Sequence, residues 1–190
     1  FEKTVLKDVM YGPYNLGMTK EEAEESARES LRQVGIEPSY YHVSPLELSG
    51  GQKRSVAIAG VLAMNPSVLI LDEPAAGLDP YTKRQVFDLI LNIQMERSLA
   101  VVLVSHHMED VARYANQVWV MHDGQLALQG SPKEVFSQTK LLKELNIGIP
   151  QVTSVTEKMM ECGLPLERTA ISVDDAENMI LQMLGRREGR

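Results

Sequence analysis

Residues 48–79 read LSGGQKRSVAIAGVLAMNPSVLILDEPAAGLD, and this stretch decides the fold. Ser49, with Gln52 three residues later, has the spacing of a capping box, which predicts a helix that begins here. The two glycines between them allow a ligand to approach the backbone closely. Because the first amides of a helix have no partner within it, the beginning of a helix suits an anion. The pattern therefore predicts an anion site at the start of a helix that Asn65-Pro66 stops.

A short apolar run follows that helix and ends in two acids. Val68 to Leu71 are all aliphatic, which indicates a strand buried on both faces of a parallel sheet. Asp72 and Glu73 come next, at the carboxyl end of the strand, where open α/β sheets bind their ligands. Successive side chains of a strand point in different directions. The two carboxylates can therefore take different roles, one binding a metal and the other orienting a water.

Together these motifs resemble those of the ATP-binding cassette (ABC) ATPase family. LSGGQ is similar to the signature motif of that family, VLILDE to its Walker B motif, and the turn at Leu78-Asp79 to its D-loop. The resemblance implies Asp72 as the Mg²⁺ ligand, Glu73 as the general base that activates water, and Asp79 as a further catalytic residue. The residues that would bind the γ-phosphate of an ATP held mainly by a partner subunit are Ser49, Gly50, Gly51 and Gln52.

Each motif by itself also has a purely structural explanation. An SGG stretch commonly forms a loop with a helix cap, and many apolar strands end in an acid. Asp79-Pro80 is a favourable beginning for a helix and needs no further function. These explanations are independent of one another, so the order and spacing of all three motifs favour the ABC interpretation.

The second apolar run of the chain carries a candidate histidine. Ala100 to Val104 follow a long amphipathic helix expected at Pro80 to Arg97, and the succession of strand, helix and strand predicts a parallel sheet. Ser105-His106-His107 come directly after this run. ABC ATPases have a switch-loop histidine after Ser or Thr at this place. The resemblance therefore implies that His106 bonds the γ-phosphate and positions Glu73 and the water.

The composition is that of an ordinary globular protein. Of the 190 residues, 44% are hydrophobic and 24% are charged, and the formal net charge is -7. This negative balance argues against nucleic acid as a partner, because broad nucleic-acid binding needs a basic face. Cys162 is the only cysteine, so an internal disulfide is impossible. No apolar run approaches the ~20 residues of a membrane-spanning helix, so we expect any membrane role to be peripheral.

The sequence contains no P-loop. A P-loop requires Gly-Lys followed by Ser or Thr, and none of the 13 glycines precedes a lysine. The chain also begins at Phe1, so we expect a fragment without the N-terminal part of the family's core. Loss of four hydrogen bonds to phosphate costs at least ~6 kcal/mol, or about 10⁴ in affinity. We therefore expect the chain alone to bind ATP poorly and to be inactive as an ATPase.

The succession of strand, helix and strand predicts an α/β fold, and the resemblance implies the parallel-sheet core of a P-loop NTPase of the ABC type, lacking its N-terminal part. The resemblance also implies a division of the chain into three parts. Residues 1–48 are expected to form a helical subdomain. Residues 49–135 would be the ATPase core with signature, Walker B, D-loop and switch histidine. Residues 136–190 would be a small helical dimerisation tail.

Three smaller expectations concern local structure. A helix capped by Thr4 should end before Gly12-Pro13, because proline interrupts helices. Asp123-Gly124 should form the tight turn of a β-hairpin. Trp119, on the first strand of that hairpin, should lie in the core.

The tail narrows the resemblance to one group of ABC proteins. PKEVF at 132–136, GIP at 148–150 and CGLP at 162–165 resemble the ATPase subunits of energy-coupling factor (ECF) transporters, which import vitamins or transition-metal ions such as cobalt. The resemblance implies ATP and Mg²⁺ as cofactors and a position at the cytoplasmic face of the cell membrane. It also implies transmembrane energy-coupling and substrate-binding subunits as partners. The second ATPase subunit of the dimer can be an identical or a related chain.

Two other functions remain open. The chain could be the C-terminal head lobe of a chromosome-maintenance or DNA-repair ABC ATPase, in which the signature is also separated from the P-loop. Such proteins should have long heptads before the signature, whereas residues 1–47 contain only short capped helices. The chain could also be a dimerisation module that does not hydrolyse ATP.

Overall fold

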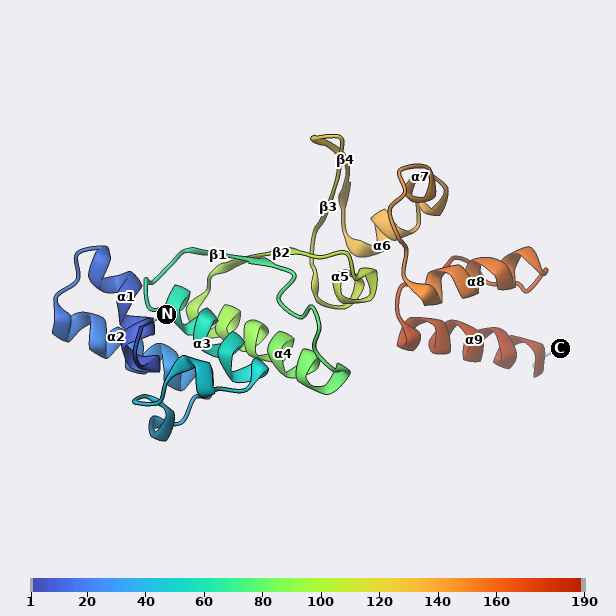
Figure 1. Cartoon of the computed structure of the whole chain (residues 1–190). Helices are drawn as coiled ribbons and strands as arrows, with labels where there is room; N and C mark the ends of the chain where they lie inside the picture. The colour runs from blue at the N-terminus through green and yellow to red at the C-terminus, as the bar shows by residue number, and fades with distance from the viewer. Residues whose placement is uncertain (1, 189–190) are drawn as a thin grey trace. The chain divides into compact units, whose positions relative to one another are not determined.

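A computed structural model describes residues 2–188 of the chain. It divides into two compact units, Phe1–Val104 and Ser105–Arg190 (Figure 1). No helix among the described residues is long and apolar enough to cross a membrane.

The first unit begins with two packed helices, α1 (Val5–Asn15) and α2 (Lys20–Gln33). Thr19 starts α2 with a capping box: the Glu22 amide donates to the Thr19 hydroxyl at 3.2 Å, and the Thr19 amide donates to the Glu22 carboxylate at 2.8 Å. The capping box thus gives an acceptor to two of the amides that have no partner within the helix at its start. Residues at helical spacing then form the buried face of α2, namely Ala23, Ala27 and Leu31.

The expected end of α1 was wrong. Thr4 caps the helix as predicted, but α1 runs through Gly12-Pro13 and ends only at Asn15. Packing explains the difference, because α1 lies so close to the segment after α3 that a Cβ on Gly12 would come 2.8 Å from the Met64 sulfur. Contact with α3 and its continuation therefore outweighs the local effect of proline.

Two short 3₁₀ helices, η1 (Pro38–Tyr40) and η2 (Pro45–Glu47), lead from α2 to α3 (Gly50–Leu62). The apolar side of α3 is buried, and Asn65 takes a left-handed conformation with φ 53° just beyond its end. The helix therefore begins and ends where the sequence predicts.

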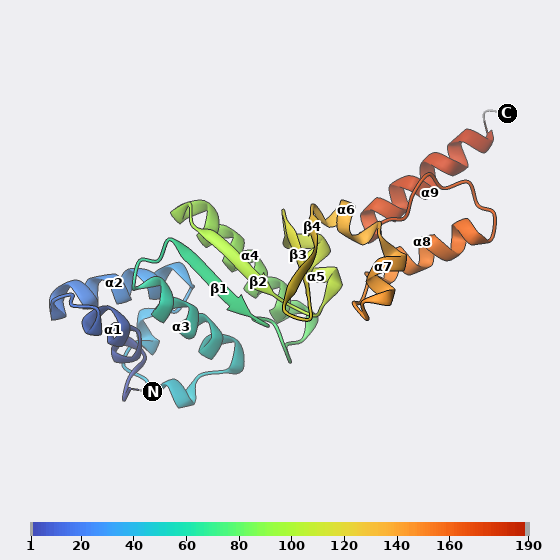
Figure 2. The same cartoon turned by 90° about the horizontal axis from the view of Figure 1, so that it is seen from above.

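A parallel strand pair forms the centre of the first unit. β1 (Val68–Asp72) and β2 (Ala100–Val104) are joined by α4 (Pro80–Arg97), so the predicted strand, helix and strand unit is confirmed. Val68 pairs with Ala100 and Asp72 with Val104. Helices α3 and α4 lie together on one face of this pair (Figures 1 and 2).

The prediction that β1 is buried on both faces was wrong. Leu69, which faces the helices, is 1% exposed, but its neighbour Ile70 is 68% exposed. Alternate residues of a strand point to opposite faces, and no described element of the first unit covers the face opposite α3 and α4 (Figure 1). The apolar side chains on this open face are Val68, Ile70, Val102 and Val104.

The second unit contains a β-hairpin packed on short helices. The hairpin strands are β3 (Val118–His122) and β4 (Gln125–Gly130); the helices are α5 (Met108–Tyr114), α6 (Pro132–Phe136) and α7 (Thr139–Glu144). Asp123 and Gly124 have φ values of 47° and 74°, as a tight hairpin turn between twisted strands requires. The predicted hairpin is therefore confirmed.

Trp119 does not lie in the core, contrary to our expectation. Its neighbours Val118 and Val120 point into the cluster around Phe136, so alternation turns Trp119 to the other face of the hairpin, where it is 67% exposed.

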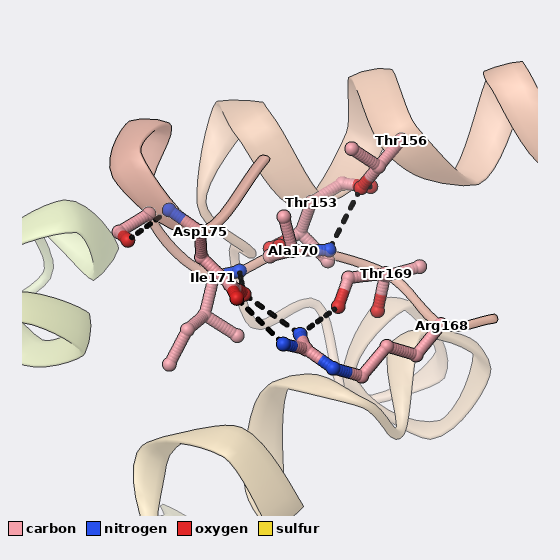
Figure 3. Close-up of polar contacts among 8 residues, drawn as sticks. Thr153, Thr156, Arg168, Thr169, Ala170, Ile171 and Asp175 are labelled. Atoms are coloured by element: carbon pink, nitrogen blue, oxygen red, sulfur yellow. Dashed lines mark hydrogen bonds and ion pairs between the residues drawn. The ribbon is translucent and has the colours of Figure 1, made fainter. Parts of the chain in front are cut away.

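The tail ends in two helices, α8 (Gln151–Glu161) and α9 (Val173–Glu188). The Thr153 hydroxyl donates to the Ala170 carbonyl at 2.7 Å, and the Ala170 amide donates to the Thr156 hydroxyl at 3.0 Å (Figure 3). The Arg168 guanidinium forms an ion pair with the Asp175 carboxylate. Buried hydroxyls on α8 thus fix the segment that leads into α9.

Candidate active site

The predicted anion site lies at the first turn of α3. The Ser49 amide donates to the Gln52 side-chain oxygen at 3.0 Å, and the Gln52 amide donates to the Ser49 hydroxyl at 3.3 Å. This capping box uses two of the four amides that a helix start leaves without partners. The amides of Gly50 and Gly51, on the turn between them, have no acceptor within the helix. They are the natural donors for an external anion.

The two glycines of this turn differ in their surroundings. A Cβ on Gly50 would meet nothing within 4 Å, whereas a Cβ on Gly51 would come 3.3 Å from the Thr82 methyl group of α4. Gly50 is therefore open to a large partner, and Gly51 allows α3 and α4 to approach each other closely. Lys53 and Arg54 follow on α3 and add positive charge near the same turn.

Asp72 and Glu73 lie at the carboxyl end of β1, as predicted. Asp72 is the last residue of the strand and is exposed, while Glu73 is half-buried. The Glu73 amide donates to the Val104 carbonyl at 2.9 Å, which extends the parallel ladder by one bond. Glu73 also has a φ of 47°, in the left-handed region that a non-glycine residue enters only at a cost. Such strain is typical of positions where function fixes the residue.

Asp79 is the N-cap of α4. Its carboxylate accepts from the Tyr81 and Thr82 amides at 3.0 and 3.1 Å. Hydrogen bonds from the Thr82 side chain and then from the Thr82 amide hold the pKa of Asp79 below its ordinary value. Asp79 is thus an ionised cap that fixes the end of the loop between β1 and α4.

A residue that sequence reasoning missed joins this loop to the signature helix. The Arg54 guanidinium, on α3, donates to the Ala76 carbonyl at 3.0 Å. The start of α3 therefore lies beside the loop that ends in Asp79. The sequence shows only a basic residue two positions after Gln52. Helical spacing does not indicate which group that residue would bond.

His106 belongs to the second unit. It follows β2 by two residues, is exposed, and its ring centroid lies 4.3 Å from that of His107 at an interplanar angle of 33°. The His107 amide donates to the Ser105 hydroxyl at 3.1 Å, which turns the chain into α5. The other candidate residues, Ser49 to Gln52, Asp72, Glu73 and Asp79, all lie in the first unit.

The donor atoms at the end of β1 fit a magnesium ion. Mg²⁺ prefers carboxylate oxygen, takes one or two carboxylates, and keeps several waters. Asp72 supplies such an oxygen at an exposed position where waters can complete the shell. The amides at the start of α3 fit a phosphate. These two donor types match a magnesium-bound nucleotide.

Comparisons with known proteins agree with these motifs. Residues 2–76 match the ABC transporter family. The energy-coupling factor transporter ATP-binding protein EcfA2 of Caldanaerobacter subterraneus is 44% identical over 184 residues, which is 97% of this chain and 64% of that protein. The chain therefore spans less than two thirds of the length of this relative.

Solved structures share the fold. The structure of cbiO1 from Clostridium perfringens, part of the ABC transporter complex cbiONQ, matches with a TM-score of 0.66 and 36% identity over 83% of this chain and 62% of that chain. The ATP-binding cassette MJ0796, as a dimer in a post-hydrolysis state bound to ADP and Pi, matches with a TM-score of 0.55 and 31% identity over 68% of this chain and 56% of that chain. The signature turn, the carboxylates after β1 and these likenesses all lead to one conclusion: the chain belongs to the ABC transporter family and has the α/β fold of its ATPase domain.

Proposed function

We propose that the chain carries the signature helix and the hydrolytic carboxylate of an ABC transporter ATPase of the ECF type. The similarity to EcfA2 over 97% of the chain supports the ECF assignment. The capping box that opens α3, with Gly50 open to an approaching partner, is the observation that carries the ATP-binding role.

In this proposal two ATPase subunits enclose two molecules of ATP. The amides of Gly50 and Gly51, together with Ser49 and Gln52, bind the γ-phosphate of the nucleotide held mainly by the other subunit. A phosphate that carries negative charge gains from the positive end of α3 and from the amides that point out of it. The ATP-binding cassette MJ0796, a relative of this chain, has been solved as a dimer bound to ADP and Pi, which supports the proposal.

The carboxylates after β1 take the remaining roles. Asp72 would hold Mg²⁺, which neutralises charge on the phosphates. Glu73 accepts a proton from the attacking water, a general-base contribution of about 10²–10⁴ in rate. His106 would bond the γ-phosphate, and Asp79 fixes the loop beside the signature of its own subunit.

The domain roles follow from the same proposal. Residues 1–48 form the helical subdomain, residues 49–135 belong to the ATPase core, and residues 136–190 form a tail that pairs the two ATPases. Tyr11 and Tyr14 on α1 are 62% and 59% exposed, which suits a surface that receives a helix of a transmembrane partner. The protein would then bind at the cytoplasmic face of the membrane and energise uptake of a vitamin or of a transition-metal ion such as cobalt.

The substitution Gly50→Asp tests the phosphate site without disturbing the fold. A Cβ at this position meets nothing within 4 Å, and an acid in the first turn favours the helix. The added charge opposes a phosphate. In the full gene product, with whatever residues the gene encodes before Phe1, we expect Mg-ATP hydrolysis to fall at least ~10-fold at an unchanged melting temperature.

Gly50→Ala is the matched control, because it adds a Cβ without charge and should change hydrolysis far less. If Gly50→Asp hydrolyses ATP as fast as the unchanged protein, the phosphate does not bind at the start of α3.

A further inference from the structure

The last residues of three helices of the first unit meet at one arginine side chain. Arg97 ends α4, Leu62 ends α3 and Gln33 ends α2. The Arg97 guanidinium donates from one terminal nitrogen to the Leu62 carbonyl at 2.7 Å and from its Nε to the Gln33 side-chain oxygen at 2.9 Å. Its other terminal nitrogen donates to Gln33 and, at 3.3 Å, to the Ser30 hydroxyl.

Arginine is suited to this position by both charge and shape. The carboxyl end of a helix carries partial negative charge, and three such ends close together repel one another. The guanidinium offsets this repulsion, and its planar fork donates in several directions at once. Ser30 is fully buried and Arg97 is half-buried, so the bond between them is partly shielded from water.

The other end of α3 is the proposed phosphate site. It is held against the loop before α4 by the bond from Arg54 to the Ala76 carbonyl and by the close approach of Gly51 to Thr82. Helices α3 and α4 therefore run side by side in the same direction, with contacts at both ends (Figure 2). The position of the first turn of α3, where the phosphate is proposed to bind, therefore depends on the orientation of the whole helix.

We propose that Arg97 is a positioning residue that orients the signature helix for phosphate binding by tying its carboxyl end to α2 and α4. This inference rests on the function proposed above for the start of α3. A helix of the length of α3 is about 20 Å long, so a tilt of about 6° around its middle moves the first turn by about 1 Å. A displacement of that size at a reacting group can lower a rate about 10²-fold.

Substitution of Arg97 in the full gene product tests the proposal. Arg97→Gln removes the charge and most of the fork, and Arg97→Lys keeps the charge but can reach fewer acceptors. We expect kcat for Mg-ATP hydrolysis to fall at least ~10-fold in Arg97→Gln and to recover partly in Arg97→Lys. KM should change less than kcat, because ATP is held mainly by the other subunit.

Arg84→Gln is the matched control, because Arg84 is an exposed arginine on the same helix. Gln33→Ala is a milder variant that removes one acceptor and keeps Arg97; it should also lower kcat in a folded protein. If Arg97→Gln and Gln33→Ala remain folded and turn over ATP as fast as Arg84→Gln, the proposal is wrong.

Hydrogen exchange separates this inference from the proposed function. If Arg97 orients α3, amides in the first turn of α3 should exchange faster in Arg97→Gln than in Arg84→Gln, even though that turn lies at the opposite end of the helix. Faster exchange with no ATPase activity in the unchanged protein would overturn the proposed function alone. Unchanged exchange at the first turn, in an active protein whose kcat is insensitive to Arg97, would overturn the positioning role alone.

Discussion

At the scale of single residues, Glu73 carries a candidate catalytic carboxylate on a strained backbone position. It follows a half-buried strand position at Leu71 and an exposed one at Asp72, and its backbone lies in the left-handed region with φ 47°. The amide bond to Val104 holds this conformation in place. The strain therefore belongs to the backbone position and can be measured apart from the carboxylate.

A pair of variants isolates that strain. Glu73→Ala and Glu73→Gly both remove the carboxylate, but only glycine occupies the left-handed region without a steric cost. We expect Glu73→Gly to be more stable than Glu73→Ala by about 1 kcal/mol in urea unfolding, the reverse of the usual order in regular structure. Equal stability, or a more stable alanine variant, would mean that the turn after β1 relaxes to another conformation.

Most candidate site residues could be proposed from the sequence because each follows a local pattern. The capping spacing of Ser49 and Gln52 and the acids after an apolar run depend only on near neighbours in the chain. Arg54 and Arg97 could not be identified in this way. Their partners, the carbonyls of Ala76 and Leu62, are far along the chain. Every residue has a backbone carbonyl, so the residue type does not show which carbonyl an arginine will bond.

At the scale of elements, the connection between α8 and α9 depends on two buried threonines. Thr153 and Thr156 are 0% and 1% exposed, and between them they satisfy both backbone groups of Ala170 (Figure 3). The two hydroxyls thus replace the backbone groups that a neighbouring β-strand would offer to Ala170. Substitution by valine keeps the shape of either side chain and removes only its hydroxyl.

We expect Thr156→Val to lower the free energy of unfolding by about 1–3 kcal/mol, because it leaves the buried Ala170 amide without an acceptor. Thr153→Val should cost less, since an unpaired carbonyl is tolerated better than an unpaired amide. Chemical denaturation of the two variants checks the order. Equal losses, or a larger loss in Thr153→Val, would contradict it.

The ion pair at the start of α9 makes the stability of this element depend on pH. Hydrogen bonding to Arg168 is the main cause that lowers the pKa of Asp175 below its ordinary value of 3.8, and the Ile171 amide adds to the effect. A carboxyl whose pKa is lower in the folded state stabilises the fold above the unfolded pKa. This stability is lost as the pH falls through the folded value.

Asp175→Asn should therefore reduce stability near neutral pH, and the difference from the unchanged protein should shrink below about pH 4. We expect a loss of about 1 kcal/mol, which allows for solvent screening at an Arg168 side chain that is 36% exposed. Asp174→Asn, at the neighbouring exposed position, is the matched control. A difference that stays constant down to the lowest pH would exclude the ion pair as its source.

At the scale of the whole molecule, the sequence predicted the order and type of the elements better than their burial. The predicted parallel pair β1 and β2, the hairpin turn at Asp123-Gly124 and the helices of the tail are all present. Ile70 and Trp119, however, were predicted to be buried, and both are exposed. An apolar pattern reports that a face can be buried, whereas burial depends on what packs against it.

The measurement that tests the central claim most directly is Mg-ATP hydrolysis by three samples. They are the chain of residues 1–190, the full gene product, and the full gene product with Glu73→Gln. We predict activity only in the full, unchanged product, with a loss of about 10²–10⁴ in rate on Glu73→Gln. If Glu73→Gln hydrolyses ATP normally, Glu73 is not the general base. If the full product is inactive even with its membrane partner, the ATPase account is wrong and the chain serves as a dimerisation module.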